Sequence, residues 1–525
     1  MIKRVIRWLF IGVGAVIAGL VLVVAASLVY TNSEGESFKN EKLAFVNQLR
    51  VPPLLGPTIV NGEKNFTINI EDAATAILPG ARTHTRGYNG TILGPTIRAR
   101  KGDKVRMHVT NMLGESTTVH WHGMHLPAVM DGGPHQLIGP GASWEPYWTI
   151  TNEAGTLWYH PHMLGKTAPQ VYAGLAGLFI IDDDNSNSLA LPKTYGVDDI
   201  PLVVQDRSFD GDNQFVYKHK RRSRLSAGEV GDTILVNGTY APYVEVPATL
   251  IRLRILNGSN ARRYNFGFSD GRTFHQIASD GGLLPSPEAR TRMILSPGER
   301  AEIVVDTSNG ARTTLMSYEV TDGFSALRRA VFRLILNSDD RFQRFKVLEL
   351  RPNGRGGATA RLPAKLNTIE RLTPASATRT RTFLLDASSI NGKLMDHKRV
   401  DEIVKNGDVE IWSITALLPM LYHNFHIHGV QFQVLDRTRN GRRTEPPSSE
   451  SGWKDTVIVG PHETVRVIAR FGGFADPARP YMFHCHILEH EDMGMMGQYL
   501  VVDDLKQPVK IDSRLEGAVM RGMAH

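Results

Sequence analysis

The chain has 525 residues, of which 42% are hydrophobic, and its formal net charge is +7. This length suffices for more than one packed core and is typical of about three domains. Because Cys485 is the one cysteine, disulfide bonds within the chain are excluded. The sequence contains no nucleic-acid-binding motif and no aromatic residues interleaved with its basic ones.

Basic residues are concentrated at the N-terminus and in one internal segment. Those in the first seven positions precede an uncharged apolar run, residues 8–30, that is long enough to span a bilayer. We therefore expect residues 1–30 to be an inner-membrane anchor, or a signal segment cleaved near Ala25–Ser27, with the rest of the chain on the periplasmic side of the cell envelope. The second segment, Lys218–Arg224, predicts a solvated loop, with contact to anionic lipid or an acidic partner as the alternative.

Short strand-like segments, separated by Gly, Pro, Asn and Asp, follow a polar stretch at residues 31–48 that predicts a tether. In one strand Val105, Met107 and Val109 alternate and are expected to face one side. Similar turn-and-strand units, centred on Gly102, Gly298 and Gly407, predict three related β-sandwich modules in an all-β fold. The expected boundaries are 49–188 for domain 1, 189–345 for domain 2, 346–380 for a linker, 381–505 for domain 3 and 506–525 for a tail.

Ten of the 19 histidines fall in four short clusters. The clusters are His120-Trp-His122, His160-Pro-His162, His423-Asn-Phe-His426-Ile-His428 and His484-Cys485-His486-Ile-Leu-Glu-His490. In a strand, residues two apart project from the same face, so each His-X-His presents two imidazoles on one side. Several metal ions could be held by such pairs, and imidazole suits copper, zinc, iron or nickel.

Cys485 lies between two of these histidines and is therefore expected to point to the opposite face. There it could join His423, His490 and the thioether of Met495 around a different metal. Two histidines, one cysteine and a weak thioether form the blue-copper electron-transfer pattern, whereas zinc normally takes a second thiolate, a third histidine or a carboxylate. Electrons arriving at Cys485 would have a short route to metals held by its two neighbours.

The segment His484–Met496 resembles the C-terminal signature of the multicopper oxidases, the family of laccases, bilirubin oxidases and periplasmic copper-efflux oxidases. All four copper motifs of that family occur in order, and the similarity extends from about residue 50 to 505. Val129–Pro134 and Gly174–Gly177 are similar to segments of the bacterial copper-efflux group. The resemblance implies three cupredoxin-like Greek-key domains, with a three-copper cluster between the first and the third.

The resemblance also implies the ligands of four coppers. The type 1 copper would be bound by His423, Cys485 and His490, with Met495 axial. The type 2 copper would be bound by His120 and His426. The type 3 pair would be bound by His122, His160, His162, His428, His484 and His486.

An oxidase of this family takes single electrons from a reductant at the type 1 copper and reduces O2 to water at the cluster. Asp131 and Glu491 match proton-relay acids of the family, the alternatives being a loop-capping aspartate and a surface glutamate. Asp455 is expected either to orient a ligand histidine or to be a plain turn residue.

The likeness to the copper-efflux oxidases is incomplete. The linker lacks their methionine-rich insert, and Pro419 and Leu421 replace an acid and a methionine. We therefore expect phenols or aromatic amines as reductants, with a Cu⁺ oxidase for copper tolerance as the alternative. A copper-free structural protein, resembling cell-division proteins of this fold that have lost ligands, is a further alternative, although this chain keeps the full set. A copper nitrite reductase does not match, because it lacks His-Cys-His. The expected partners are O2, a small reductant and, through the N-terminal helix, the membrane; we expect a monomer.

Overall fold

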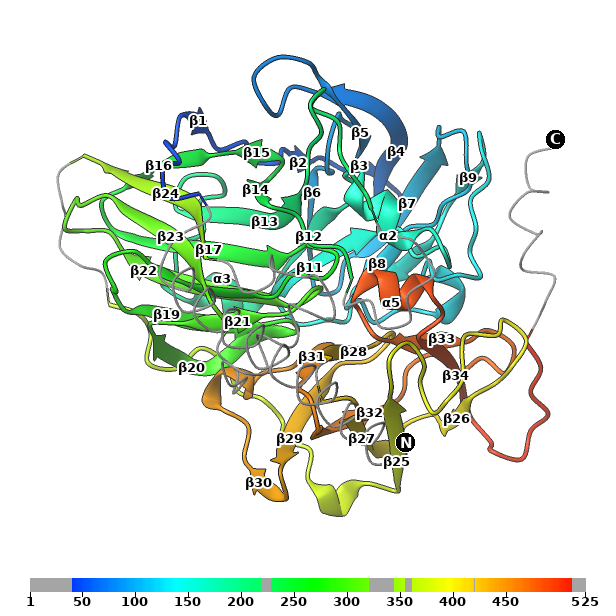
Figure 1. Cartoon of the computed structure of the whole chain (residues 1–525). Coiled ribbons are helices and arrows are strands. Elements are labelled where there is room, and N and C mark those ends of the chain that lie inside the picture. The colour runs from blue at the N-terminus through cyan, green and yellow to red at the C-terminus, as the bar shows by residue number, and fades with distance from the viewer. Residues whose placement is uncertain (1–39, 219–227, 321–343, 355–360, 420, 512–525) are drawn as a thin grey trace, which may run out of the picture.

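The computed structural model describes residues 40–218, 228–320, 344–354, 361–419 and 421–511. Across these residues the fold is mostly β, with six sheets consistent with three cupredoxin domains (Figure 1). The expected membrane segment, residues 8–30, lies outside them, and so does the expected loop Lys218–Arg224 apart from Lys218 itself. Among the described helices, none is both long and apolar enough to cross a bilayer.

The first domain is a sandwich of two sheets. One contains β10 (Tyr147–Thr149), β7 (Lys104–Asn111), β4 (Glu63–Thr75) and β3 (Thr58–Val60), with β5 (Thr83–Tyr88) on β4 and β9 (Ser143–Trp144) on β7. The other contains β2 (Leu54–Leu55), β6 (Thr96–Arg100), β12 (Gly177–Asp182), β11 (Gly155–His160) and β8 (His120–His122).

The second domain again pairs two sheets. One contains β15 (Thr239–Tyr240), β14 (Thr233–Val236), β13 (Asp199–Arg207), β17 (Leu250–Asn257), β22 (Arg300–Asp306), β19 (Phe274–Ser279) and β20 (Gly282–Arg290). The other contains β1 (Asn47–Gln48), β16 (Pro242–Pro247), β24 (Phe345–Asn353), β23 (Thr313–Tyr318), β18 (Tyr264–Phe268) and β21 (Met293–Leu295). Strand β1 comes from the segment expected to be a tether, and β24 runs into the segment expected to be a linker.

The third domain is built in the same way. One sheet contains β25 (Arg379–Leu385), β27 (Val409–Ala416), β32 (Glu463–Arg470), β29 (Phe432–Arg439) and β30 (Arg442–Thr444). The other contains β26 (Glu402–Lys405), β34 (Met496–Val502), β33 (Tyr481–His484), β28 (His423–Ile427) and β31 (Thr456–Val459).

Period-two patterning explains why each pair of sheets encloses a core. In β7 the residues Val105, Met107 and Val109 are fully buried while their neighbours are partly exposed, as expected. The turn before β7 depends on Gly102, and the equivalent turns depend on Gly298 and Gly407; all three have a positive φ. Strand β22 departs from the expected alternation, because it is buried on both faces and also packs against β11 of the first domain.

Short helices join the first and third domains. Helix α2 (Thr167–Tyr172) packs against α5 (Leu488–Asp492), as Figure 1 shows. Asp492 accepts hydrogen bonds from the backbone N–H groups of Thr167 and Ala168 at 3.0 and 2.9 Å, so a third-domain carboxylate satisfies the first turn of α2. The remaining short helices are α3 (Asp184–Ser188), η1 (Ala128–Met130), η3 (Pro374–Ser376) and η4 (Ser448–Glu450).

Candidate metal centre

The histidine pairs lie where strands of the first and third domains meet. Strand β8 holds the whole His120–His122 pair, whereas the other three His-X-His pairs each straddle the end of a strand. Pro161 has no N–H to continue a β-ladder, which accounts for one of these ends. All ten clustered histidines are buried, and the rings of the eight paired ones form a continuous network of contacts.

Three histidines converge through their Nε2 atoms. The Nε2 of His484 lies 3.0 Å from that of His162 and 3.1 Å from that of His428. The opposite ring nitrogens face carboxylates: His428 Nδ1 is 2.7 Å from Asp131 Oδ2, and the Nδ1 atoms of His162 and His484 are each 3.3 Å from a Glu491 oxygen. Hydrogen bonds to Asp131 at His428 Nδ1 and to the Cys485 carbonyl, 3.1 Å from His484 Nδ1, fix the proton there and leave these two Nε2 lone pairs for a metal.

A second set of three histidines lies beside the first. His122 Nε2 is 2.9 Å from Asp455 Oδ1, which leaves Nδ1, 3.4 Å from His160 Nε2, as the free nitrogen. His160 Nδ1 in turn donates to the carbonyl of Pro161 at 2.7 Å. The His486 ring centre is 4.9 Å from that of His122, and within the described chain neither of its nitrogens has a hydrogen-bond partner.

His120 and His426 complete this group. Their Nδ1 atoms donate to the backbone carbonyls of Asp131 and Asp455, each at 2.8 Å. Their Nε2 atoms are buried and, among the described residues, have no hydrogen-bond partner. Unpartnered buried acceptors are costly, so these nitrogens are positioned for a ligand that the residues themselves do not supply.

Cys485 faces the other way, as expected. Its Sγ lies 3.5 Å from His490 Nδ1 and 3.7 Å from His423 Nδ1. Met495 is also fully buried, and its carbonyl accepts a hydrogen bond from the Cys485 N–H at 3.1 Å. Burial raises the pKa of the Cys485 thiol to about 12, so a bound cation is required to keep the thiolate at neutral pH.

Burial sets the protonation of the whole centre. It lowers the pKa of His120 to about 3 and of His486 to about 4, and lowers those of His423 and the other six paired histidines as well, so these imidazoles are in the neutral, ligand form. It also raises the pKa values of Asp131 and Glu491 well above their usual range. Neutral imidazoles with free lone pairs and one soft thiol fit copper.

Two residues that the sequence reasoning did not single out contact the centre. Asn424 Oδ1 accepts a hydrogen bond from the backbone N–H of His486 at 2.7 Å and lies 3.5 Å from Cys485 Sγ. Arg300 donates two hydrogen bonds to Asp455, at 2.6 and 2.7 Å. The place of Asn424 inside a histidine motif was the available signal for it. Arg300 comes from the second domain, and no spacing pattern connects it to the histidines.

This fold and this donor arrangement define a metalloprotein of cupredoxin domains, consistent with type 1 and trinuclear copper sites. Comparison with known proteins agrees with that class. A family model described as multicopper oxidase matches residues 69–186, and a second with the same description matches residues 361–504.

The chain belongs to the multicopper oxidase family, as expected from its motifs. It is 38% identical over 455 residues to the cell division protein FtsP of Escherichia coli K12, covering 86% of this chain and 92% of that one. Among solved structures, a laccase from Pediococcus acidilactici is 38% identical with a TM-score of 0.77, covering 87% of this chain and 94% of that one. The laccase-like multicopper oxidase CueO from Ochrobactrum sp. is 35% identical with a TM-score of 0.77, covering 86% and 100%.

Proposed function

We propose that the protein is a copper-dependent oxidase that couples one-electron oxidation of a small reductant to the reduction of O2 to water. One observation carries this proposal: a buried thiol set (His423, Cys485, His490) and a buried imidazole set are joined by the three consecutive residues His484–His486. His423, Cys485, His490 and Met495 would hold a type 1 copper. His120 and His426 would hold a type 2 copper, and the two sets of three histidines would hold a type 3 pair.

Copper would supply the redox chemistry, accepting electrons one at a time and delivering them together to O2. The protein would fix the ligands and provide protons. Asp131 accepts a hydrogen bond from His428 Nδ1, and the Glu491 carboxyl lies 3.3 Å from Nδ1 of both His162 and His484. Asp131 Oδ1 has no hydrogen-bond partner among the described residues, so this carboxyl can carry a proton beside the imidazole cluster.

Phenols or aromatic amines are the reductants we favour. The sequence between residues 351 and 380 contains no methionine, and Pro419 and Leu421 stand where a Cu⁺ site would need an acid and a thioether. The CueO relative from Ochrobactrum has oxidase activity towards lignin model compounds, which supports the same class. Cu⁺ itself, as a reductant in copper tolerance, is the alternative.

The test is oxygen uptake by the copper-loaded chain with a phenol, an aromatic amine and Cu⁺ compared side by side. We expect blue absorbance, four coppers per chain and uptake with the organic reductants. A Cys485→Ser variant should lose the blue band and the uptake, while retaining the other coppers. Full copper loading without uptake for any reductant would exclude an oxidase.

A role in cell division is the second candidate, and the E. coli relative named as a cell division protein is what favours it. The complete donor set argues for copper chemistry in this chain. Complementation of a cell-division defect by the Cys485→Ser variant as well as by the wild type would favour the structural role. For either function, the N-terminal apolar run leads us to propose that the folded part lies on the periplasmic side of the inner membrane.

A further inference from the structure

Arg300 lies where all three domains meet. It opens β22 of the second domain, and its side chain is fully buried. Its Nε donates to the carbonyl of Thr156 in the first domain at 3.0 Å, and its two terminal nitrogens donate to the Asp455 carboxylate of the third. The carbonyls of Gly298 and Asp280 accept the other two bonds, at 3.0 and 2.9 Å. All five guanidinium N–H groups are thereby satisfied, which fixes the fork rigidly.

Asp455, which Arg300 holds in place, contacts two histidines of the metal centre. Its side chain accepts from His122 Nε2 at 2.9 Å and from Thr456 Oγ1 at 2.9 Å, and its backbone carbonyl accepts from His426 Nδ1 at 2.8 Å. One residue therefore orients a histidine from the first domain and a histidine from the third. Without Arg300, the buried Asp455 carboxylate would lose its cationic partner and the two hydrogen bonds that this partner donates.

We propose that Arg300 is a positioning residue for the copper cluster: it holds Asp455 so that His122 and His426 present their free nitrogens at a fixed separation. The second domain, which supplies none of the proposed ligands, would thereby control the cluster between the other two. The inference rests on the proposed copper sites, and His423, Cys485 and His490 provide an internal reference because Arg300 contacts none of them.

The test is an Arg300→Lys variant of the full chain, which keeps the positive charge but loses the planar guanidinium and its five fixed N–H donors. We expect the cluster to bind copper about 10–100-fold more weakly, as for other residues behind metal ligands, with a changed type 2 electron paramagnetic resonance signal and a retained blue band. Asp455→Asn should give the same spectrum, and the double variant should add nothing further, because both residues act along one path.

Arg254→Lys is the matched control. Arg254 is also buried in the second domain, pairs with Asp199 and Glu302, and donates to the Thr156 hydroxyl at 3.0 Å, but it does not contact Asp455. Equal copper loss in Arg254→Lys, or a full cluster with an unchanged signal in Arg300→Lys, would overturn the proposal. If neither the wild type nor any variant binds cluster copper, the proposed function fails instead.

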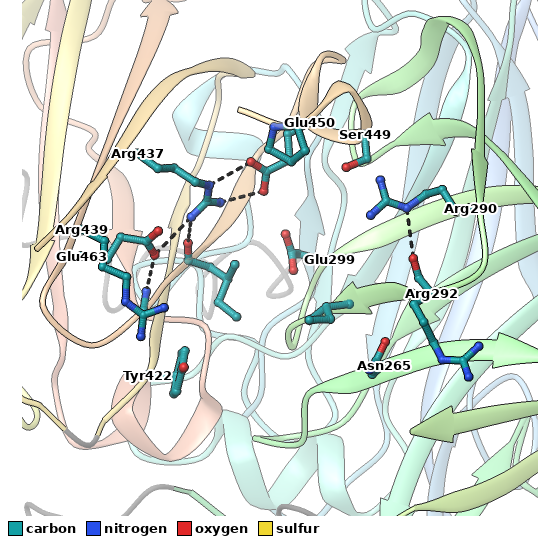
Figure 2. A pocket seen from close by; sticks show the side chains of 14 residues that line it. Asn265, Arg290, Arg292, Glu299, Tyr422, Arg437, Arg439, Ser449, Glu450 and Glu463 are labelled. Carbon is teal, nitrogen blue, oxygen red and sulfur yellow. Dashed lines mark hydrogen bonds and ion pairs between the residues drawn. The ribbon is translucent and has the colours of Figure 1, made fainter. Parts of the chain in front are cut away.

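A separate cavity of about 500 Å³ lies between the second and third domains (Figure 2). Its carboxylates already have cationic partners. Glu450 and Glu463 pair with Arg437 at 2.7 and 3.3 Å, and Glu299 pairs at 3.0 Å with Lys454, which does not line the cavity. Arg437 thus serves two of these carboxylates, and Lys454 also pairs with Asp280 at 2.8 Å. Two further arginines lie on the second-domain side of the cavity.

Those arginines are Arg290 and Arg292, and within the described chain neither forms an ion pair. Arg290 Nε donates to the carbonyl of Arg292 at 3.1 Å, as Figure 2 shows, and Arg292 donates to the carbonyl of Thr291 at 2.7 Å. The Arg292 guanidinium also lies 3.5 Å from the Tyr318 ring centre. Burial lowers the pKa of Arg290, so a bound anion would stabilise its charged form.

We infer that this cavity binds a small aromatic carboxylate, with the carboxylate on Arg290 and the ring against Tyr422 and Ile458. Tyr422 directly precedes His423, so the ligand would lie next to the proposed electron-entry site. That such a carboxylate serves as reductant rests on the proposed function; its binding does not.

Calorimetry with benzoate, which is not a reductant, and its neutral analogue benzamide tests the site on the copper-loaded chain. We expect benzoate to bind more tightly than benzamide, and the Arg290→Gln variant to weaken benzoate binding at least tenfold. Arg312→Gln, at an exposed second-domain position outside the cavity, should leave binding unchanged. Unchanged benzoate affinity in Arg290→Gln, or no preference of the wild type for benzoate over benzamide, would refute the site whatever the oxygen uptake.

Discussion

Substitution of Asp131 separates two roles that one carboxylate combines. Its Oδ2 accepts the His428 Nδ1 proton at 2.7 Å, and its backbone carbonyl holds His120 whatever the side chain. In Asp131→Ala the buried His428 N–H loses its acceptor, at a cost of about 1–3 kcal/mol. Since 1.4 kcal/mol is a factor of ten, copper at this histidine set should bind about 5–150-fold more weakly.

Asp131→Asn is the matched variant, because its amide oxygen can still accept from His428 while it cannot deliver a proton. We expect copper content close to that of the wild type and oxygen uptake about tenfold or more slower. Copper per chain and uptake rate, measured on the same samples, distinguish the effects. Unimpaired uptake in Asp131→Asn would refute the proton role, and undiminished copper affinity in Asp131→Ala would refute the positioning role.

Three further predictions follow from other parts of the structure. Burial opposes ionisation of Glu302, but Arg252 and Arg254 outweigh it and lower its pKa to about 2. The ionised Glu302 therefore contributes roughly 3 kcal/mol to the free energy of unfolding above pH 4.5, and this contribution is lost as the pH falls towards 2. Urea unfolding at a series of pH values should therefore show a weaker acid dependence in Glu302→Gln. Gly123 has φ +83°, and a Cβ there would come within 2.5 Å of Asp455 Oδ2, so Gly123→Ala should lose cluster copper. The control is Gly141→Ala, at φ +73° with open space around it, which should lower the free energy of unfolding by only about 1–2 kcal/mol and keep its copper. Removing copper with a chelator should lower the free energy of unfolding by about 4 kcal/mol, compared with a sample in which free copper is at a thousand times its Kd. An unchanged unfolding curve would show that the buried histidines do not bind copper.

Local patterns in the sequence predicted the strands well. Alternation at Val105, Met107 and Val109 reflects a single buried face and needs no knowledge of neighbours. The same reasoning fails for β22, whose second face is covered by β11 of another domain. It also missed that Asn47 and Gln48 form a strand, because a sheet edge pairs with backbone groups whatever the side chains are.

For the metal centre, too, local geometry could be predicted from the sequence, whereas contacts between distant segments could not. Spacing alone placed Cys485 opposite His484 and His486, because strand geometry is local. It could not show that His162 meets His428 and His484, nor that Arg300 reaches Asp455, since those contacts depend on how the domains are arranged. Arg300 has no spacing pattern that relates it to the histidines, and only the folded arrangement connects it to them.

The ratio of reductant oxidised to O2 consumed is the most direct test of the account. If the copper at Cys485 passes electrons to copper held by the histidine cluster, the protein should use four one-electron equivalents of a phenol for each O2 and release no hydrogen peroxide. A ratio of two with accumulation of peroxide, or oxidation of the phenol without oxygen uptake, would contradict it.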